Sequence, residues 1–406
     1  MREADIRSKC RITSNRDRDT FVGLKCDDGD ISVNFPIGYH LSENNKELRK
    51  DILLLLTVLA ENTERKDSEL PGPGRRFEEV EFPMQSYLYL IKDFFARGYY
   101  REQESSYKTA RTGKICWSRT IKSQQPYVQD RDVFYLDFVT KKNSKKENEL
   151  ITLIHEYCVY ESFDRMGWLF TTVQPKKPRI SKREKVFRAV LREKISHTFQ
   201  DRNRMLFRHM LAIVDYEGDR DSDRNYHYGT YRFEYIWEAL INKVFGIEKK
   251  RDYYPGTTWQ VNGVKYNNEP LKPDTIMLCG NNVYILDAKY YKYGVTGRLC
   301  DLPGSESVNK QITYGEYVAY AHKFKEKHGS DMKVYNAFLM PFDSWKNNDA
   351  DNLEMIKIGE AGSSWKDDSE EYHRIKGILV DIRTLMKLNA RQDLKAIEKL
   401  AELIVS

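Results

Sequence analysis

Apolar residues recur at helical spacing in several long segments of the chain. In Tyr231–Phe245 they form one continuous stripe, and Gly246 follows as a helix-ending residue. The same spacing predicts six further helices, over Lys46–Glu64, Tyr87–Gly98, Glu147–Met166, Lys182–Asp215, Ser307–His328 and Arg391–Val405.

Short apolar runs bounded by turn residues predict strands in the last third of the chain. A helix, a hairpin, another helix and two more strands follow one another there, which is the order of an α/β domain. The predicted strands are Thr275–Leu278, Val283–Tyr290, Val334–Met340 and Gly377–Val380. We therefore expect the C-terminal half to fold as an α/β domain.

Breaks in the helical pattern predict how the chain is divided. Leu70–Gly74 and Gln174–Pro178 each contain two prolines, which neither a helix nor a central strand accommodates. Glu217–Asn225 alternates acidic and basic residues and has the composition of a mobile loop. The predicted parts are an N-terminal region (1–173), a basic helical connector (174–225) and a C-terminal domain (226–406).

Composition narrows the class of protein. The 406 residues include 40 % hydrophobic residues, 27 Tyr and 18 Phe, which excludes wholesale disorder. The longest apolar run, Ile52–Ala60, is too short to span a bilayer, and the charged N-terminus lacks a signal peptide's apolar stretch. Six cysteines without a CxxC pair favour reduced thiols over a zinc ribbon. We expect a cytoplasmic protein with no membrane contact.

Positive charge is concentrated in one segment. The whole chain carries +6, whereas Gln174–Met210 holds twelve Lys or Arg against three acids. Such a segment either contacts nucleic-acid phosphates or is a solvated helix face with a linker, and charge alone leaves both open. The candidate DNA contacts are Lys182, Arg183, Lys185 and Arg188.

The hairpin predicted between Lys272 and Lys289 carries a carboxylate on each strand. With Gly280 and Asn281 as a two-residue loop, Asp274 lies opposite Asp287. Like charges so close destabilise a sheet, so this pair needs a cation, and Mg²⁺ suits oxygen ligands. Side-chain alternation puts Lys289 on the same face as Asp287.

Two carboxylates, a lysine and a metal ion suit phosphodiester hydrolysis. The ion polarises the phosphate and lowers the pKa of an attacking water, while the ammonium group orients that water or offsets developing charge. Glu234 and Glu238 lie one turn apart on the preceding helix, where either could reach the metal or simply face solvent. Gln311, near the start of the next helix, could contact the water or a phosphate.

These residues resemble a known nuclease motif. Pro273-Asp274 with Asp287-Ala288-Lys289-Tyr290-Tyr291-Lys292 is similar to the PD-(D/E)xK motif, and the second string to McrC, the nuclease subunit of the McrBC restriction system. Gly113–Ile121 and the QxxY of Gln311–Tyr314 also resemble McrC-like proteins. Asn336–Pro341 resembles the LlaJI-type restriction endonucleases, and the whole similarity spans Phe82 to Met340.

The resemblance implies a fold and roles for individual residues. It implies a C-terminal PD-(D/E)xK domain, with a mixed sheet flanked by helices, after a mixed α+β N-terminal region and a helical middle. Asp274 and Asp287 carry over as metal ligands and Lys289 as the catalytic lysine. Trp237-Glu238 fits the family's aromatic-Glu pattern better than Glu234 does.

The resemblance also implies a function. It implies a Mg²⁺-dependent endonuclease that cleaves double-stranded DNA with a separate McrB-like AAA+ GTPase, on which the N-terminal region docks. GTP would enter only through that partner, since the chain has no GxxxxGK[ST] motif. Two alternatives remain open. One is a stand-alone type II endonuclease, whose N-terminal region recognises DNA bases instead of docking on a partner, with the basic 174–210 stretch on phosphates. The other is a non-catalytic adaptor whose Asp pair forms salt bridges with Lys272 and Lys289.

Overall fold

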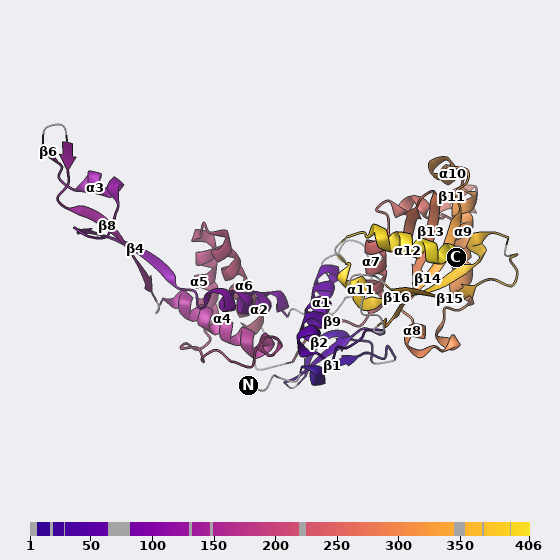
Figure 1. Cartoon of the computed structure of the whole chain (residues 1–406), viewed down its shortest axis with the longest axis horizontal. Helices are drawn as coiled ribbons and strands as arrows, with labels where there is room; N and C mark the ends of the chain where they lie inside the picture. Colours follow the sequence, from indigo (N-terminus) through magenta and orange to yellow (C-terminus); the bar gives the residue numbers. More distant parts are fainter. Residues whose placement is uncertain are drawn as a thin grey trace. The chain divides into compact units, whose positions relative to one another are not determined.

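The chain folds into two compact units (Figure 1). One comprises Met1–Ala4 and Glu81–Asp223, and the other comprises Asp5–Val80 and Arg224–Ser406. The predicted break at residues 70–74 and the centre of the predicted loop at 217–225 lie outside the described residues. The computed structural model describes residues 6–16, 19–27, 29–63, 82–129, 132–146, 149–218, 225–344, 354–367, 369–389 and 391–406.

These units divide the chain differently from the three parts predicted from the sequence. The first strands of the chain belong with the C-terminal part, because β2 (Val22–Asp27) pairs with β9 (Tyr226–Thr230). The basic segment belongs with residues 81–173, because α5 (Glu184–His197) and α6 (Asp201–Gly218) pack on α4 (Leu150–Met166). The predicted boundary near residue 225 lies next to the boundary between the units.

The smaller unit is a helical cluster that carries a long antiparallel arm. In the helical cluster, the predicted helix over 182–215 is two helices, because Thr198 between α5 and α6 is extended. Polar strands make the arm, and a small hairpin lies at its end. The remaining elements of this unit are α2 (Met84–Arg97), β4 (Glu102–Ala110), β5 (Lys114–Ile115), α3 (Trp117–Ser123), β6 (Tyr127–Gln129), β7 (Asp132–Phe134), β8 (Phe138–Lys146) and η2 (Gly167–Leu169).

The larger unit begins with a four-stranded sheet. Its order is β1 (Cys10–Ile12), β3 (Asp30–Phe35), β2 and β9. Gly23 and Gly229 face each other across β2 and β9. A Cβ at either glycine would lie 2.2 Å from a backbone oxygen of the other strand, so this pairing requires glycine on both sides.

A five-stranded mixed sheet forms the centre of the larger unit. The strands lie in the order β12, β13, β14, β16, β15, with the middle three parallel and both outer strands antiparallel. The predicted α/β fold with a mixed sheet is therefore confirmed. The strands are β12 (Thr275–Cys279), β13 (Asn282–Ala288), β14 (Val334–Phe342), β15 (Met355–Ala361) and β16 (Ile375–Asp381).

Helices cover this sheet on both faces. Successive residues of β13 are buried, which requires cover on each side. Val283 and Ile285 pack against Tyr314 and Val318 of α9 (Ser305–Tyr320). A second group of helices contacts the sheet, and α7 within this group contacts the other two helices. It consists of α7 (Phe233–Phe245), α11 (Ile382–Lys387) and α12 (Leu394–Val405).

The remaining elements of the larger unit are short, apart from α1. The predicted helix over 307–328 ends at Tyr320, because Ala321 is extended, and α10 follows. No helix of the described chain is long and apolar enough to cross a membrane. These elements are η1 (Arg7–Lys9), α1 (Asn45–Thr63), η3 (Lys250–Tyr253), β10 (Thr258–Val261), β11 (Val264–Asn267), α8 (Tyr293–Thr296), η4 (Leu299–Asp301), α10 (His322–His328) and η5 (Glu371–His373).

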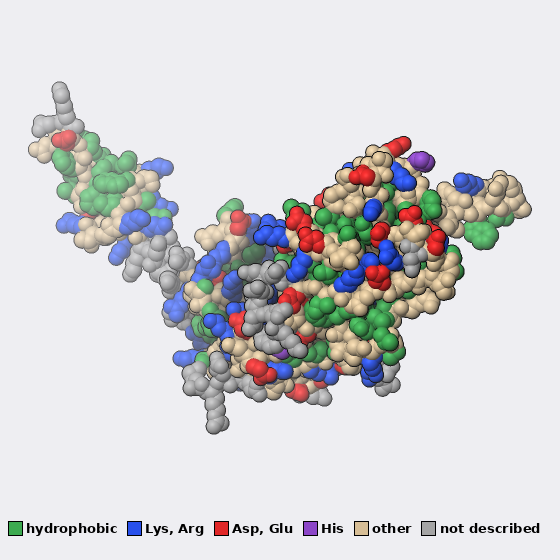
Figure 2. Space-filling model, turned by 45° about the vertical axis from the view of Figure 1, so that its right-hand side comes forward, with side chains coloured by type: hydrophobic (Ala, Val, Ile, Leu, Met, Phe, Trp, Pro, Cys, Tyr) green, Lys and Arg blue, Asp and Glu red, His purple; other side chains and the backbone are tan. Residues whose placement is uncertain are grey.

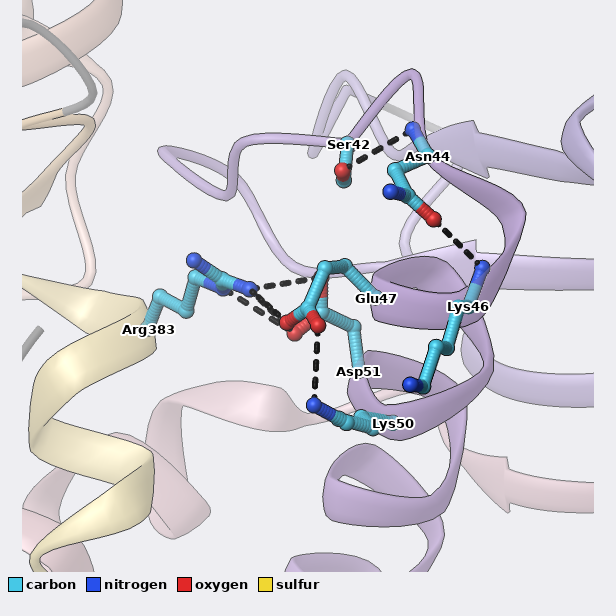
Figure 3. A network of polar contacts seen from close by, with 7 residues as sticks. All are labelled: Ser42, Asn44, Lys46, Glu47, Lys50, Asp51 and Arg383. Carbon is cyan, nitrogen blue, oxygen red and sulfur yellow. Dashed lines mark hydrogen bonds and ion pairs between the residues drawn. The ribbon is translucent and has the colours of Figure 1, made fainter. Parts of the chain in front are cut away.

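A buried ion pair joins α1 to α11 (Figure 3). The guanidinium of Arg383 contacts both carboxylate oxygens of Asp51, at 2.9–3.2 Å. Asp51 is only 1 % exposed, and its burial raises its pKa although Arg383 acts in the opposite direction. Glu47 lies at the edge of this pair and binds the exposed Lys50. Residues far apart in sequence are thus tied together within the larger unit.

Candidate active site

The hairpin of β12 and β13 brings the two predicted carboxylates together. Its pairs run from Cys279–Asn282 at the turn to Thr275–Leu286, so the next pair outward is Asp274 with Asp287. Gly280 has φ +58°, the left-handed conformation that a two-residue turn requires. The predicted turn and register are confirmed.

Asp274 is partly buried beside Asp287. Its Oδ2 accepts a hydrogen bond from the Ala288 backbone N–H at 2.9 Å. Burial raises the pKa of Asp274 well above its usual value, and the negative charge of Asp287 adds to this effect. Asp287 itself is 6 % exposed. Two carboxyl groups are therefore held together at one end of the hairpin, and the charge of Asp287 disfavours ionisation of Asp274.

Lys289 lies at the same end and contacts the pair. Its Nζ is 2.7 Å from Oδ2 of Asp287 and lies over the ring of Phe338. Lys272, by contrast, is ion-paired with Glu269 at 3.5 Å. The site thus has one lysine ammonium bound to one of its two carboxylates.

Of the two candidate glutamates on α7, the geometry favours Glu238. Burial raises the pKa of Glu238, and the charge of Asp287 is the next largest cause, so the two carboxylates are electrostatic neighbours. Glu234 is ion-paired with Arg232 at 3.1 Å. The Nε1 of Trp237, next to Glu238, donates to the Leu339 carbonyl and fixes α7 against β14.

Gln311 is next to the site but points into the core. Only 1 % of it is exposed, and its Nε2 donates to the Ile285 carbonyl at 2.7 Å and to Asn336. This bond holds α9 on β13, two residues before Asp287. A side chain so buried is out of reach of a DNA phosphate, so the predicted contact with phosphate is not available to Gln311 in this structure.

Three further residues contact or influence the site, of which Lys250 carried no signal in the sequence, whereas Tyr290 and Tyr314 entered only as parts of motifs. Lys250 donates to the Asp274 carbonyl at 2.7 Å. The buried hydroxyl of Tyr290 accepts from the Ile37 N–H at 2.8 Å, which ties the N-terminal segment to the hairpin. Burial and then the charge of Asp274 raise the pKa of Tyr314. The alternation within DxKY, which puts Tyr290 on the face opposite Lys289, could have indicated its burial.

The donors present fit a divalent metal ion. Asp287 lies at the carboxyl end of β13, where it neighbours Phe338 in the middle of β14. Oxygen ligands suit Mg²⁺, and a cation would relieve the repulsion between Asp274 and Asp287. No group of three or more His, Cys, Asp or Glu is arranged as a metal site within the described ranges. Asp274 and Asp287 are thus the two candidate ligands.

The structure divides the candidate DNA contacts into two kinds. Lys182, Arg183 and Lys185 are exposed at the start of α5. Arg188 is ion-paired with both Glu184 and Asp215. Further basic residues of the same segment are also ion-paired with acids, namely Arg179, Lys194, Arg202 and Arg204. Part of the positive charge is therefore compensated within the protein.

Fold and site together define an α/β protein with a carboxylate–lysine site at the edge of a mixed sheet. The model of the LlaJI restriction endonuclease family matches residues 34–362. The chain belongs to this family and is a nuclease of a restriction system.

The chain is also similar to a protein of known structure. A chain in the refined half-complex from the tetradecameric assembly of Thermococcus gammatolerans McrB AAA+ hexamers with bound McrC is similar, with a TM-score of 0.36 and 16 % identity. The match covers 95 % of this chain and 83 % of that chain. No curated protein matches this chain.

Proposed function

We propose that this nuclease is a Mg²⁺-dependent DNA endonuclease of the PD-(D/E)xK type that works with a separate McrB-like AAA+ GTPase. One observation carries the catalytic part of the proposal. Asp274, Asp287 and Lys289 converge at the open end of one hairpin, and the charge of Asp287 disfavours ionisation of Asp274. Two neighbouring carboxylates destabilise the folded protein unless a cation binds to them.

Each residue has a proposed role in the reaction. Asp274 and Asp287 hold the metal ion, which when bound polarises the phosphate and lowers the pKa of a water. Lys289 donates hydrogen bonds to the attacking water or to phosphate oxygens, at a position that Asp287 fixes in the resting protein. Glu238 is a third acid within electrostatic reach. Gln311 positions the strand that carries Asp287.

Metal binding should depend on pH in a defined direction. The pKa of Asp274 is raised, so this carboxyl keeps its proton to a higher pH than an ordinary aspartate. Only the ionised form binds Mg²⁺, so affinity should increase with pH until that pKa is passed, and binding should release protons. Calorimetric titration in two buffers of different ionisation enthalpy measures both effects. A Mg²⁺ affinity that is constant from mildly acidic to neutral pH contradicts this prediction.

The exposed basic residues Lys182, Arg183 and Lys185 are proposed to contact DNA phosphates. They lie at the N-terminus of a helix, where cations do not favour helix stability, so helix formation does not explain them. Arg188 is assigned to holding α5 against α6 instead, because it bridges Glu184 and Asp215.

The end of the arm is proposed to bind the partner subunit. Exposed apolar side chains gather around α3, β6 and β7 (Figure 2). Val128 is 72 % exposed, and Ile121 and Leu136 are about as exposed. A cluster of this kind on an extended arm is typical of a protein interface. The predicted role of the N-terminal region in partner docking is therefore assigned to residues 114–138.

Plasmid cleavage with and without the partner tests the function. With Mg²⁺, GTP and the product of the neighbouring gene, we expect linear plasmid to accumulate, and we expect little cleavage when any one of the three is left out. A Val128→Ser, Val133→Ser variant should lose the cleavage that the partner stimulates but keep Mg²⁺ binding, because both residues belong to the arm and not to the metal site.

The outcomes separate the alternatives. Cleavage at defined sites with Mg²⁺ alone would support a stand-alone type II endonuclease. DNA binding without cleavage under every condition would support the non-catalytic adaptor. The pairing of Lys272 with Glu269 rather than with either aspartate of the site counts against the salt-bridge arrangement expected of that adaptor.

A further inference from the structure

A second hairpin projects from the larger unit close to the candidate active site. Strands β10 and β11 pair only with each other among the described strands, and every side chain on them is exposed. Asn262 and Gly263 connect them, with φ of +51° and +79°. Two consecutive positive values define the turn that keeps a hairpin's natural twist. The ribbon therefore has a specified shape without packing on a core.

Both ends of this ribbon are fixed at the candidate site. Before it, Lys250 donates to the Asp274 carbonyl, and the buried Tyr253 stacks on Phe324. After it, the chain runs directly into Asp274. The Leu271 N–H donates to the Pro255 carbonyl and closes the base of the ribbon. The base of the ribbon therefore closes three residues before Asp274.

The register separates the ribbon into two chemically different faces. On one face, Trp259 is opposite Tyr266 and Val261 is opposite Val264, so this face is wholly apolar or aromatic. On the other face, all four residues carry hydrogen-bonding side chains. These are Thr258 opposite Asn267, and Gln260 opposite Lys265.

Size and charge of the ribbon suit a DNA groove. Four residues per strand span about 13 Å, and two strands lie about 4.8 Å apart. The major groove is about 12 Å wide and admits a two-stranded ribbon. Residues 248–272 contain five Lys or Arg and three acids, and the paired strands themselves contain no acid. No carboxylate on the strands would therefore be repelled by phosphates.

We infer that β10 and β11 enter the major groove of the DNA being cut, with Gln260 and Lys265 directed at base edges. This inference rests on the proposed nuclease function and adds a base-contacting element to it. Gln pairs with adenine and Lys with guanine in that groove. The exposed apolar face is explained without a ligand, because opposed aromatic and β-branched pairs stabilise an isolated hairpin.

Two double variants on adjacent pairs of the ladder test the inference. Gln260→Thr, Lys265→Thr removes the long polar side chains, and Trp259→Phe, Tyr266→Phe changes the opposite face but keeps an aromatic pair. Threonine suits strands and the second variant retains the aromatic contact, so both ribbons should keep their conformation. Binding of the full chain to duplex DNA is measured by fluorescence anisotropy in EDTA at low salt. Cut ends are sequenced with Mg²⁺ and the partner.

We expect the polar-face variant to bind roughly tenfold more weakly and to lose any base preference at the cut. The aromatic-face variant should resemble the wild type in both measurements. Equal binding by the polar-face variant and wild type, or a loss confined to the aromatic-face variant, overturns the inference. So does a wild type that binds no duplex. Wild-type binding that depends on Gln260 and Lys265 without cleavage leaves the ribbon's role intact and removes the proposed function instead.

Discussion

Asp287→Asn and Lys289→Ala should each reduce plasmid cleavage by about a hundred- to a thousandfold. The first change removes one of two proposed metal ligands, and the second removes the ammonium group that contacts it at 2.7 Å. Asp287→Asn also removes a charge that raises the pKa of Asp274, so the folded protein should lose no stability through Asp274. Initial cleavage rates under saturating Mg²⁺ and partner measure the effect.

The helix glutamates provide the matched control for this prediction. Glu238→Gln should lower the cleavage rate, because Glu238 is an electrostatic neighbour of Asp287. Glu234→Gln makes the same chemical change one turn away, where the side chain binds Arg232, and should leave the rate nearly unchanged. Normal activity of the Asp287 or Lys289 variant would refute the assigned site. Inactivity that accompanies lost circular dichroism or a lower melting temperature would show that the role is structural.

Arg383→Ala should lower the free energy of unfolding of the larger unit by about 3–5 kcal/mol. The change leaves Asp51, which is almost fully buried, without its cation. Burial already raises the pKa of Asp51, and loss of Arg383 should raise it further. The variant's deficit should therefore shrink as pH falls and Asp51 takes up a proton. Urea unfolding at neutral and mildly acidic pH measures this difference.

Two further variants test whether the loss of stability comes from the buried Asp51–Arg383 ion pair. Lys50→Ala removes the exposed cation next to the same pair and should change stability little (Figure 3). Asp51→Leu, Arg383→Met replaces both charges and should recover most of the loss, since an apolar pair needs no compensation. An Arg383→Ala variant as stable as the wild type would mean that water reaches Asp51 and that the contact does not tie α1 to α11.

The small strands of the N-terminal half could not be found from the sequence. The paired segments Glu102–Ala110 and Phe138–Lys146 form the arm, yet they are polar and show no alternation of apolar residues. Tyr107, Lys108 and Thr109 are exposed, and a strand without a buried face shows no apolar periodicity. The edge strand β15 was missed for a similar reason, because most of its residues are only partly buried. The sequence pattern also did not predict that helices end before Thr198 and Ala321, because neither residue is a proline or glycine.

The sequence by itself determined the hairpin that carries the site. Gly280 and Asn281 fix the turn, the side-chain period of two fixes the faces, and together they specify that Asp274 meets Asp287 with Lys289 alongside. These are local consequences of chain geometry, and they need no knowledge of the rest of the fold.

Only the tertiary structure decided which distant residues complete the site. It placed Lys250 against the Asp274 carbonyl and buried Gln311 against β13. It also joined Asp51 to Arg383, residues more than 300 positions apart. Such contacts depend on how helices pack on the sheet, and a residue's own neighbours in sequence do not encode that packing. The physical reason is that burial and long-range charge, which set these roles, exist only once the chain has folded.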